Sequence, residues 1–322
     1  MKIIVVWGLL CFAMTARCAV PFEEAYRQIS DYQTAQVAVG IAQEELTRTT
    51  RNPAAPPVDL LLAQQHVTLI ERICAQALFA AKRDHLSLYA EVLQARDAVA
   101  IAEIGVAQNE LAAQVASIRQ QAGLLPIQEL VKTTDAATRA NVDLVAAQQV
   151  ETLASLKFHT LSNEPVTPLA LPPTPDLPKM QISTLPQMVA ANFRISDAER
   201  AYLLALGPDT AAVDLQARDR DRHIAKDAAQ TLSQQLTISL ETAKHDYLAA
   251  VDMMTYCERS LSSIQKALDM VQTQYKSGVA SKMTFLEGQS MVRKAILARD
   301  TALMTLWRAY YSLYLASDAI SN

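Results

Sequence analysis

A strict apolar periodicity between residues 236 and 275 constrains the fold of this chain more than any other feature. Apolar side chains recur there at alternating steps of four and three, at Leu236, Leu240, Ala243, Tyr247, Ala250, Met254, Cys257, Leu261, Ile264, Leu268, Val271 and Tyr275. An average step of about 3.5 residues places these side chains in one row along a helix, as in a coiled coil. The row therefore predicts a long helix that has one face covered by another helix.

A glycine after this row predicts that the chain turns back. Gly278 lies among small residues, and a second amphipathic pattern begins near Met283, so we expect a hairpin of two long helices. Gly123 lies 155 residues earlier (278 − 123 = 155), and the tripeptide VDL at 58–60 recurs at 213–215 with the same offset. The sequence therefore predicts an internal duplication of one hairpin.

Composition favours an all-α fold for both copies. The chain has only seven glycines, and aromatic residues make up 6% of it, which argues against a β-rich protein. In each copy we expect a short entry helix, a long helix (60–122 and 215–277) and a return helix (127–156 and 283–317). We divide the chain into a signal peptide (1–18), a first hairpin repeat (19–160, turn at 122–126), a Pro-rich linker (161–186) and a second hairpin repeat (187–322, turn at 277–281).

The first residues have the pattern of a secretory signal. Lys2 precedes an apolar stretch from Ile3 to Met14, and Ala16 and Cys18 flank a tolerable cleavage site. A lipoprotein site at Cys18 is disfavoured because Arg17 stands where a small residue is expected. We therefore expect export from the cytoplasm, and no later segment reaches the roughly 18 to 20 apolar residues of a membrane-spanning helix.

Charge and reactive residues argue against nucleic-acid binding and catalysis. Removing Lys2 and Arg17 changes the net charge from −4 to −6 (−4 − 2 = −6), and no basic patch is interleaved with aromatic residues. Helix geometry would separate Cys74 and Cys257 too far for a disulfide, and we expect both in the core. We expect no cofactor, no metal site and no enzymatic activity, and we expect polar positions on helix faces for all five histidines, His66, His85, His159, His223 and His245.

At its turns the chain resembles the TolC-like outer-membrane efflux protein family. The second turn reads YKSGVAS at 275–281 and is followed by FLEGQ at 285–289, and the first turn reads IRQQAGLL at 118–125. The resemblance covers nearly the whole chain after the signal, with two copies of short helix, long helix, turn and return helix. It implies a homotrimer whose twelve helical columns form a periplasmic tunnel associated with the outer membrane.

The resemblance also implies roles for the turn residues. Their tips would dock a periplasmic adaptor (membrane-fusion) protein, which connects to an inner-membrane transporter, through Ala122, Gly123, Leu124, Leu125, Ser277, Gly278, Val279 and Ala280. Apolar residues at a tip without a core of its own also favour docking. Acidic residues six and nine positions after the glycine would narrow the tunnel entrance. Glu129 and Glu287 match this pattern, whereas Thr284 departs from it.

A second departure concerns the strands that the family inserts between the entry helix and the long helix. The corresponding segments, 50–60 and 206–215, are too short for two spanning strands each, so we expect the β-barrel strands to be absent. Two functions remain open at this point. One is a tunnel component of an efflux or secretion system, and the other is a non-transporting structural or scaffold protein of the cell envelope.

Overall fold

Six helices account for almost all of the described part of the chain. The computed structural model describes residues 30–162, 177, 180–207 and 211–317, so the expected signal peptide and most of the Pro-rich linker lie outside it. The helices are α2 (Ser30–Arg51), α3 (Pro57–Gln121), α4 (Ile127–Ser162), α5 (Pro186–Leu204), α6 (Ala212–Lys276) and α7 (Lys282–Ser317). Within these residues there is no strand, as expected. None of the described helices is long and apolar enough to cross a membrane.

The helix boundaries confirm two tandem hairpins. Helices α3 and α6 both have 65 residues, and both ends of α6 lie 155 residues after those of α3 (212 − 57 and 276 − 121). Helices α4 and α7 both have 36 residues and differ by the same offset (282 − 127 and 317 − 162). One packing scheme therefore serves both copies, and residues 155 apart occupy equivalent positions.

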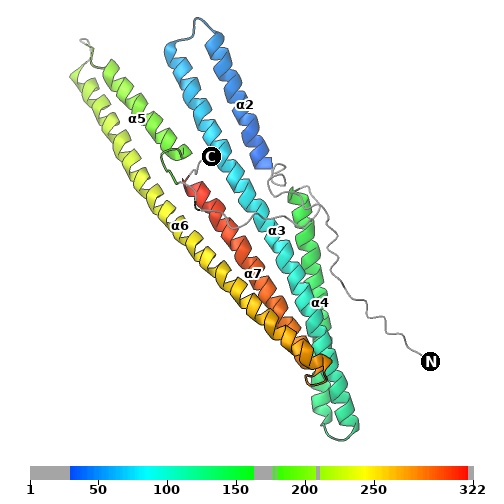
Figure 1. Ribbon diagram of the computed structural model, residues 1–322. Helices are drawn as coiled ribbons and strands as arrows, with labels where there is room; N and C mark the ends of the chain where they lie inside the picture. Colours follow the sequence, from blue (N-terminus) through cyan, green and yellow to red (C-terminus); the bar gives the residue numbers. More distant parts are fainter. Residues whose placement is uncertain (1–29, 163–176, 178–179, 208–210, 318–322) are drawn as a thin grey trace.

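The hairpins lie side by side with their turns at the same end of the molecule (Figure 1). Helices α2 and α4 lie one after the other along α3, and α5 and α7 lie one after the other along α6. Each pair of short helices therefore covers the length of one long helix. Contacts join α4 and α2 to α3, α3 to α7, and α7 and α5 to α6. The order of columns is thus α4/α2, α3, α7/α5, α6, which leaves α4/α2 and α6 as the two edges.

The apolar row predicted on α6 forms the contact with α7. Tyr247, Ala250, Met254 and Cys257 are buried there in a cluster with Ala302, Leu306 and Leu313 of α7. A second cluster joins α3, α4 and α7 and contains Leu86, Tyr89, Ala90, Val92, Phe158, Met304, Trp307 and Tyr311. Because α7 contributes to both clusters, it is the helix that holds the two repeats together.

Three expectations from the sequence need correction. Helix α4 ends at Ser162 rather than Leu156, because Phe158 is buried against α3 and the last turns of α4 are needed to place it there. His85 is not an exposed polar position: it is fully buried, and its ring lies 5.2 Å from that of Phe158. Cys74 and Cys257 are both free, as expected, but Cys74 is only half-buried.

Candidate functional site

Both turns are built on a glycine in the left-handed backbone region. Gly123 and Gly278 have φ values of 73° and 77°. In the first turn the N–H of Gly123 donates to Gln120 O (2.9 Å) and that of Leu124 donates to Arg119 O (2.8 Å). This hydrogen-bond pair defines a Schellman motif, and the second turn repeats it from Gly278 and Val279. The motif satisfies the last carbonyls of the long helix and fixes where the chain reverses.

The residues after these glycines project two apolar side chains into solvent. Leu124 is 76% exposed and Val279 is 78% exposed, and they occupy equivalent positions in the two turns. In a Schellman motif this side chain usually packs against the last turn of the helix, but the third residue from each helix end is Arg119 or Gln274. The apolar side chains therefore remain available for contact with another molecule.

The two return helices begin in different ways. The backbone N–H of Thr284 donates to Ser281 Oγ (3.1 Å), and the hydroxyl groups of the two residues lie 2.9 Å apart. Ser281 is thus the N-cap of α7, whereas Pro126 stands at the equivalent position before α4. This contact gives Thr284 a structural role at a position where the resemblance implies an acidic residue.

The predicted entrance residues are not brought together. Glu129 forms an exposed ion pair with Lys132 (Nζ–Oε1, 2.7 Å) and lines a groove of about 590 Å³ between the hairpins, with Leu125 and Met283. Glu287 is exposed on α7 and is not part of that groove. Of the predicted docking residues, only Leu125 lines the groove. The other seven lie outside it at the tips, where Ala280 is half-buried and the rest are exposed.

Replacing the tip glycine should destabilise the hairpin, although a Cβ at Gly278 would meet no atom within 4 Å. We expect Gly278→Ala to lower the free energy of unfolding by about 1 kcal/mol, because a side chain disfavours positive φ. Gly40 is the matched control: a Cβ there is also unobstructed, but Gly40 lies within α2, so Gly40→Ala should raise stability by about 0.5–1 kcal/mol. Urea unfolding checks both changes, and equal effects would contradict the strain argument.

The edge helices carry apolar rows that the sequence analysis did not identify. On α6, Ile238, Met253, Tyr256 and Met270 are more than half exposed. On α4 the more than half exposed residues include Val131, Val142, Val145 and Leu156. Of the α6 row, Ile238 and Met253 also line a groove between α6 and α7, whereas Tyr256 and Met270 are not among the residues that line it. Exposed apolar side chains that recur along one side of a helix mark a candidate interaction site.

The internal repeat shows what these rows correspond to. Met304, Trp307 and Tyr311 of α7 pack in the cluster with α3. The equivalent positions in α4 are Gln149, Thr152 and Leu156, of which Leu156 is apolar. Continued along the helix, that row reaches Val145 and Val142. On the α3 side of this contact, Gln94 donates to Thr301 Oγ1 of α7 (3.5 Å). Positions 94, 97 and 101 form one row on α3, and the equivalent positions on α6 are 249, 252 and 256, the last of which is Tyr256. Tyr256 on α6 and Leu156 on α4 thus occupy positions equivalent to residues in the rows that join α3 to α7.

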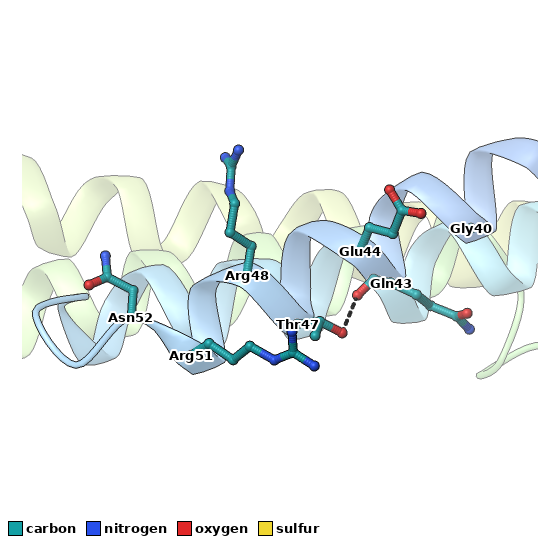
Figure 2. A pocket seen from close by; sticks show the side chains of 7 residues that line it. All are labelled: Gly40, Gln43, Glu44, Thr47, Arg48, Arg51 and Asn52. Atoms are coloured by element: carbon teal, nitrogen blue, oxygen red, sulfur yellow. Dashed lines mark hydrogen bonds between the residues drawn. The ribbon is translucent and has the colours of Figure 1, made fainter.

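The other part of the same edge, on α2, combines a polar surface with the exposed side chains of Val37 and Ile41. Figure 2 shows a shallow surface on this helix lined by Gly40, Gln43, Glu44, Thr47, Arg48, Arg51 and Asn52. The Thr47 hydroxyl donates to the Gln43 carbonyl (2.9 Å), and the side chains of Glu44, Arg48 and Arg51 extend away from the helix. The apolar character of this edge is therefore strongest on α4, in the half of the molecule nearer the turns.

The described residues contain little that suggests chemistry. No group of three or more His, Cys, Asp or Glu side chains among them is placed to hold a metal ion. Burial and the nearby Asp300 raise the pKa of Asp97 at the contact between α3 and α7. Two carboxylates this close repel each other when both are ionised, and a proton on Asp97 relieves this repulsion.

Comparison of the sequence finds neither a matching protein-family model nor a matching curated protein. Comparison of the structure finds outer-membrane channels. The CmeC outer membrane channel of Campylobacter jejuni has a TM-score of 0.59 and 10% identity, with 92% of this chain and 84% of that chain covered. The outer membrane protein VceC of Vibrio cholerae has a TM-score of 0.59 and 11% identity, with 92% and 94% covered. A membrane protein of Pseudomonas aeruginosa has a TM-score of 0.60 and 12% identity, with 92% and 88% covered.

These comparisons confirm the resemblance at the level of the fold. The chain has the helical architecture of the TolC-like outer-membrane channels, with two long hairpins in tandem. At 10–12% identity the likeness concerns the path of the chain and not individual residues.

Proposed function

We propose that this protein is a TolC-like tunnel component of an efflux or secretion system, built from several copies of the chain. The main support is that exposed apolar side chains lie on both edges, and that Leu156 on α4 is equivalent to Tyr311, which packs in the cluster between α3 and α7. When two different surfaces of one chain are complementary, each copy binds the next one head to tail. Such contacts close into a ring if the rotation between neighbouring copies is a whole fraction of a turn.

In this assembly α6 of one copy packs against α4 of the next. The contact between α3 and α7 provides its template, so Tyr256 would occupy the position of Ile101 and Leu156 that of Tyr311. Three copies, as the resemblance implies, would give twelve helical columns around one bore. The protein would act in transport by providing a path and would carry out no reaction.

The tips are proposed to dock a periplasmic adaptor, which in turn connects to an inner-membrane transporter. Leu124 and Val279 support this role, because they are among the most exposed large apolar residues and both turns hold them at the same end of the molecule. Such a partner places the protein in the periplasm in association with the outer membrane. Glu129 and Glu287 are proposed to lie at the entrance of the bore.

The alternative function is that of a structural or scaffold protein of the cell envelope. The same helices and edges would serve a scaffold, but a scaffold needs no open bore. Imaging of the purified chain together with its mass in solution distinguishes the two. Cylindrical particles with an axial channel support the tunnel, whereas particles of several copies without a channel support the scaffold.

A further inference from the structure

The most unusual buried side chain in the described structure is His85, in the first hairpin. His85 is fully buried, and its ring packs 5.2 Å from Phe158 of α4. Leu86 beside it on α3 is also fully buried, and Tyr89 lies one turn further along the helix, 6.1 Å from the same Phe158 ring. His85 therefore lies where α3, α4 and α7 meet, next to the cluster that joins the two repeats.

The second hairpin has an apolar residue at the same place. The equivalents of His85 and Phe158 are Leu240 and Leu313 (85 + 155 and 158 + 155). Leu313 is fully buried, and Leu240 packs against the same cluster between α6 and α7. A leucine thus fits this position of the fold, so packing alone does not require a histidine at position 85.

We propose that His85 makes the first hairpin sensitive to acid, so that the packing of α3 on α4 and α7 loosens as the pH falls while the second hairpin remains closed. The acid response is confined to the first hairpin, because only one of the two equivalent positions carries an ionisable group. The proposal concerns the packing within one chain and holds whether or not copies assemble into a tunnel.

Burial favours the neutral form of His85, and charged and titratable groups lie on each of the helices around it. On α3, Lys82 lies one turn away, is 8% exposed, and holds its Nζ 5.8 Å from the Phe79 ring centroid. On α4, Lys157 is paired with Glu91 (2.7 Å), and His159 is exposed. On α7, Tyr311 is buried in the neighbouring cluster, and Arg308 lines the groove toward α6. A proton on His85 would add a second positive charge next to buried Lys82.

The direction of the effect follows from linkage. Burial lowers the pKa of His85 to about 4 from its ordinary value of 6.5. When α3 separates from α4, His85 takes up a proton near its ordinary pKa. The free energy of this open state therefore falls relative to that of the closed state as the pH falls from about 6.5 toward 4. Between pH 7.5 and pH 5 the open population should rise roughly 20- to 30-fold. Asp97, whose pKa is raised, acts in the opposite direction.

Hydrogen exchange of the full chain tests this inference, with rates corrected for the intrinsic effect of pH. Wild-type peptides from 79–93 and 154–162 should show the 20- to 30-fold rise in opening, and peptides from 234–248 should not. His85→Leu, which installs the residue of the second hairpin, should abolish the rise. The reciprocal variant Leu240→His should transfer acid sensitivity to α6 and α7.

Two results would overturn the inference. One is an unchanged pH response in His85→Leu, and the other is an equal response of both hairpins in the wild-type chain. Should Leu240→His not fold, His85→Phe provides the second test, because an aromatic ring of similar shape keeps the packing and cannot titrate. A persistent rise of opening in His85→Phe would also contradict the proposal.

Discussion

Tyr256→Asp is expected to convert the assembled protein into single chains without unfolding them. Tyr256 is 68% exposed in the isolated chain, so the change removes almost no packing within it. In the proposed assembly the same side chain lies between α6 and the α4 row of the next copy. Burying a carboxylate there without a partner costs about 3 kcal/mol or more per contact, which weakens association more than a hundredfold.

Light scattering at a series of concentrations measures this effect. Thr255→Asp is the matched control, because it introduces the same charge at an exposed position. Thr255 lies next to Tyr256 in the sequence but outside the apolar row. The control should keep the mass of the wild-type assembly. If Tyr256→Asp keeps it too, the edge of α6 is not the contact between copies.

The second large effect is expected at Trp307, where the two repeats meet. Trp307 is 3% exposed, and its ring lies 5.4 Å from that of Tyr310 and 5.8 Å from that of Tyr311. Because it packs in the cluster between α3, α4 and α7, Trp307→Ala leaves a cavity on all three helices. We expect a loss of about 3–5 kcal/mol in the free energy of unfolding, the usual cost of removing a large buried aromatic residue.

Chemical denaturation followed by circular dichroism checks this loss. Met291→Ala serves as the control on the same helix, since Met291 is 58% exposed and its truncation should change stability by no more than about 0.5 kcal/mol. Similar losses in the two variants would show that α7 does not hold the repeats together as the clusters indicate.

The long helices and their turns were predictable because the signals that specify them are local. Gly123 and Gly278 mark positions that need positive φ, and the apolar row of α6 has a period that only a helix satisfies. The constant offset of 155 residues then extended the prediction for one hairpin to the other. These features depend on neighbours a few residues apart, so no knowledge of packing was required.

The edges and the buried histidine could not be predicted in the same way. Tyr256 belongs to a row interrupted by polar and small residues, and it is recognisable only once the contact of α3 with α7 is known. His85 looks like a surface residue in a sequence that reads Lys-Arg-Asp-His at 82–85, yet the meeting of three helices buries it. Both depend on which helices become neighbours. That is decided by contacts between residues more than 60 positions apart in the sequence.

The proposed contact between copies is tested most directly by a pair of engineered cysteines with an internal control. Gln94 and Thr301 touch within one chain (3.5 Å), and their equivalents are Ala249 on α6 and Ala146 on α4. With Cys74 and Cys257 replaced by alanine, Gln94→Cys with Thr301→Cys should be joined within the monomer by a short bis-maleimide crosslinker, which spans the gap left by the shorter side chains. Ala249→Cys with Ala146→Cys should instead link copies into covalent multimers that end at a closed trimer. A control pair that crosslinks within the monomer, beside a test pair that leaves the chains unlinked, would contradict the account.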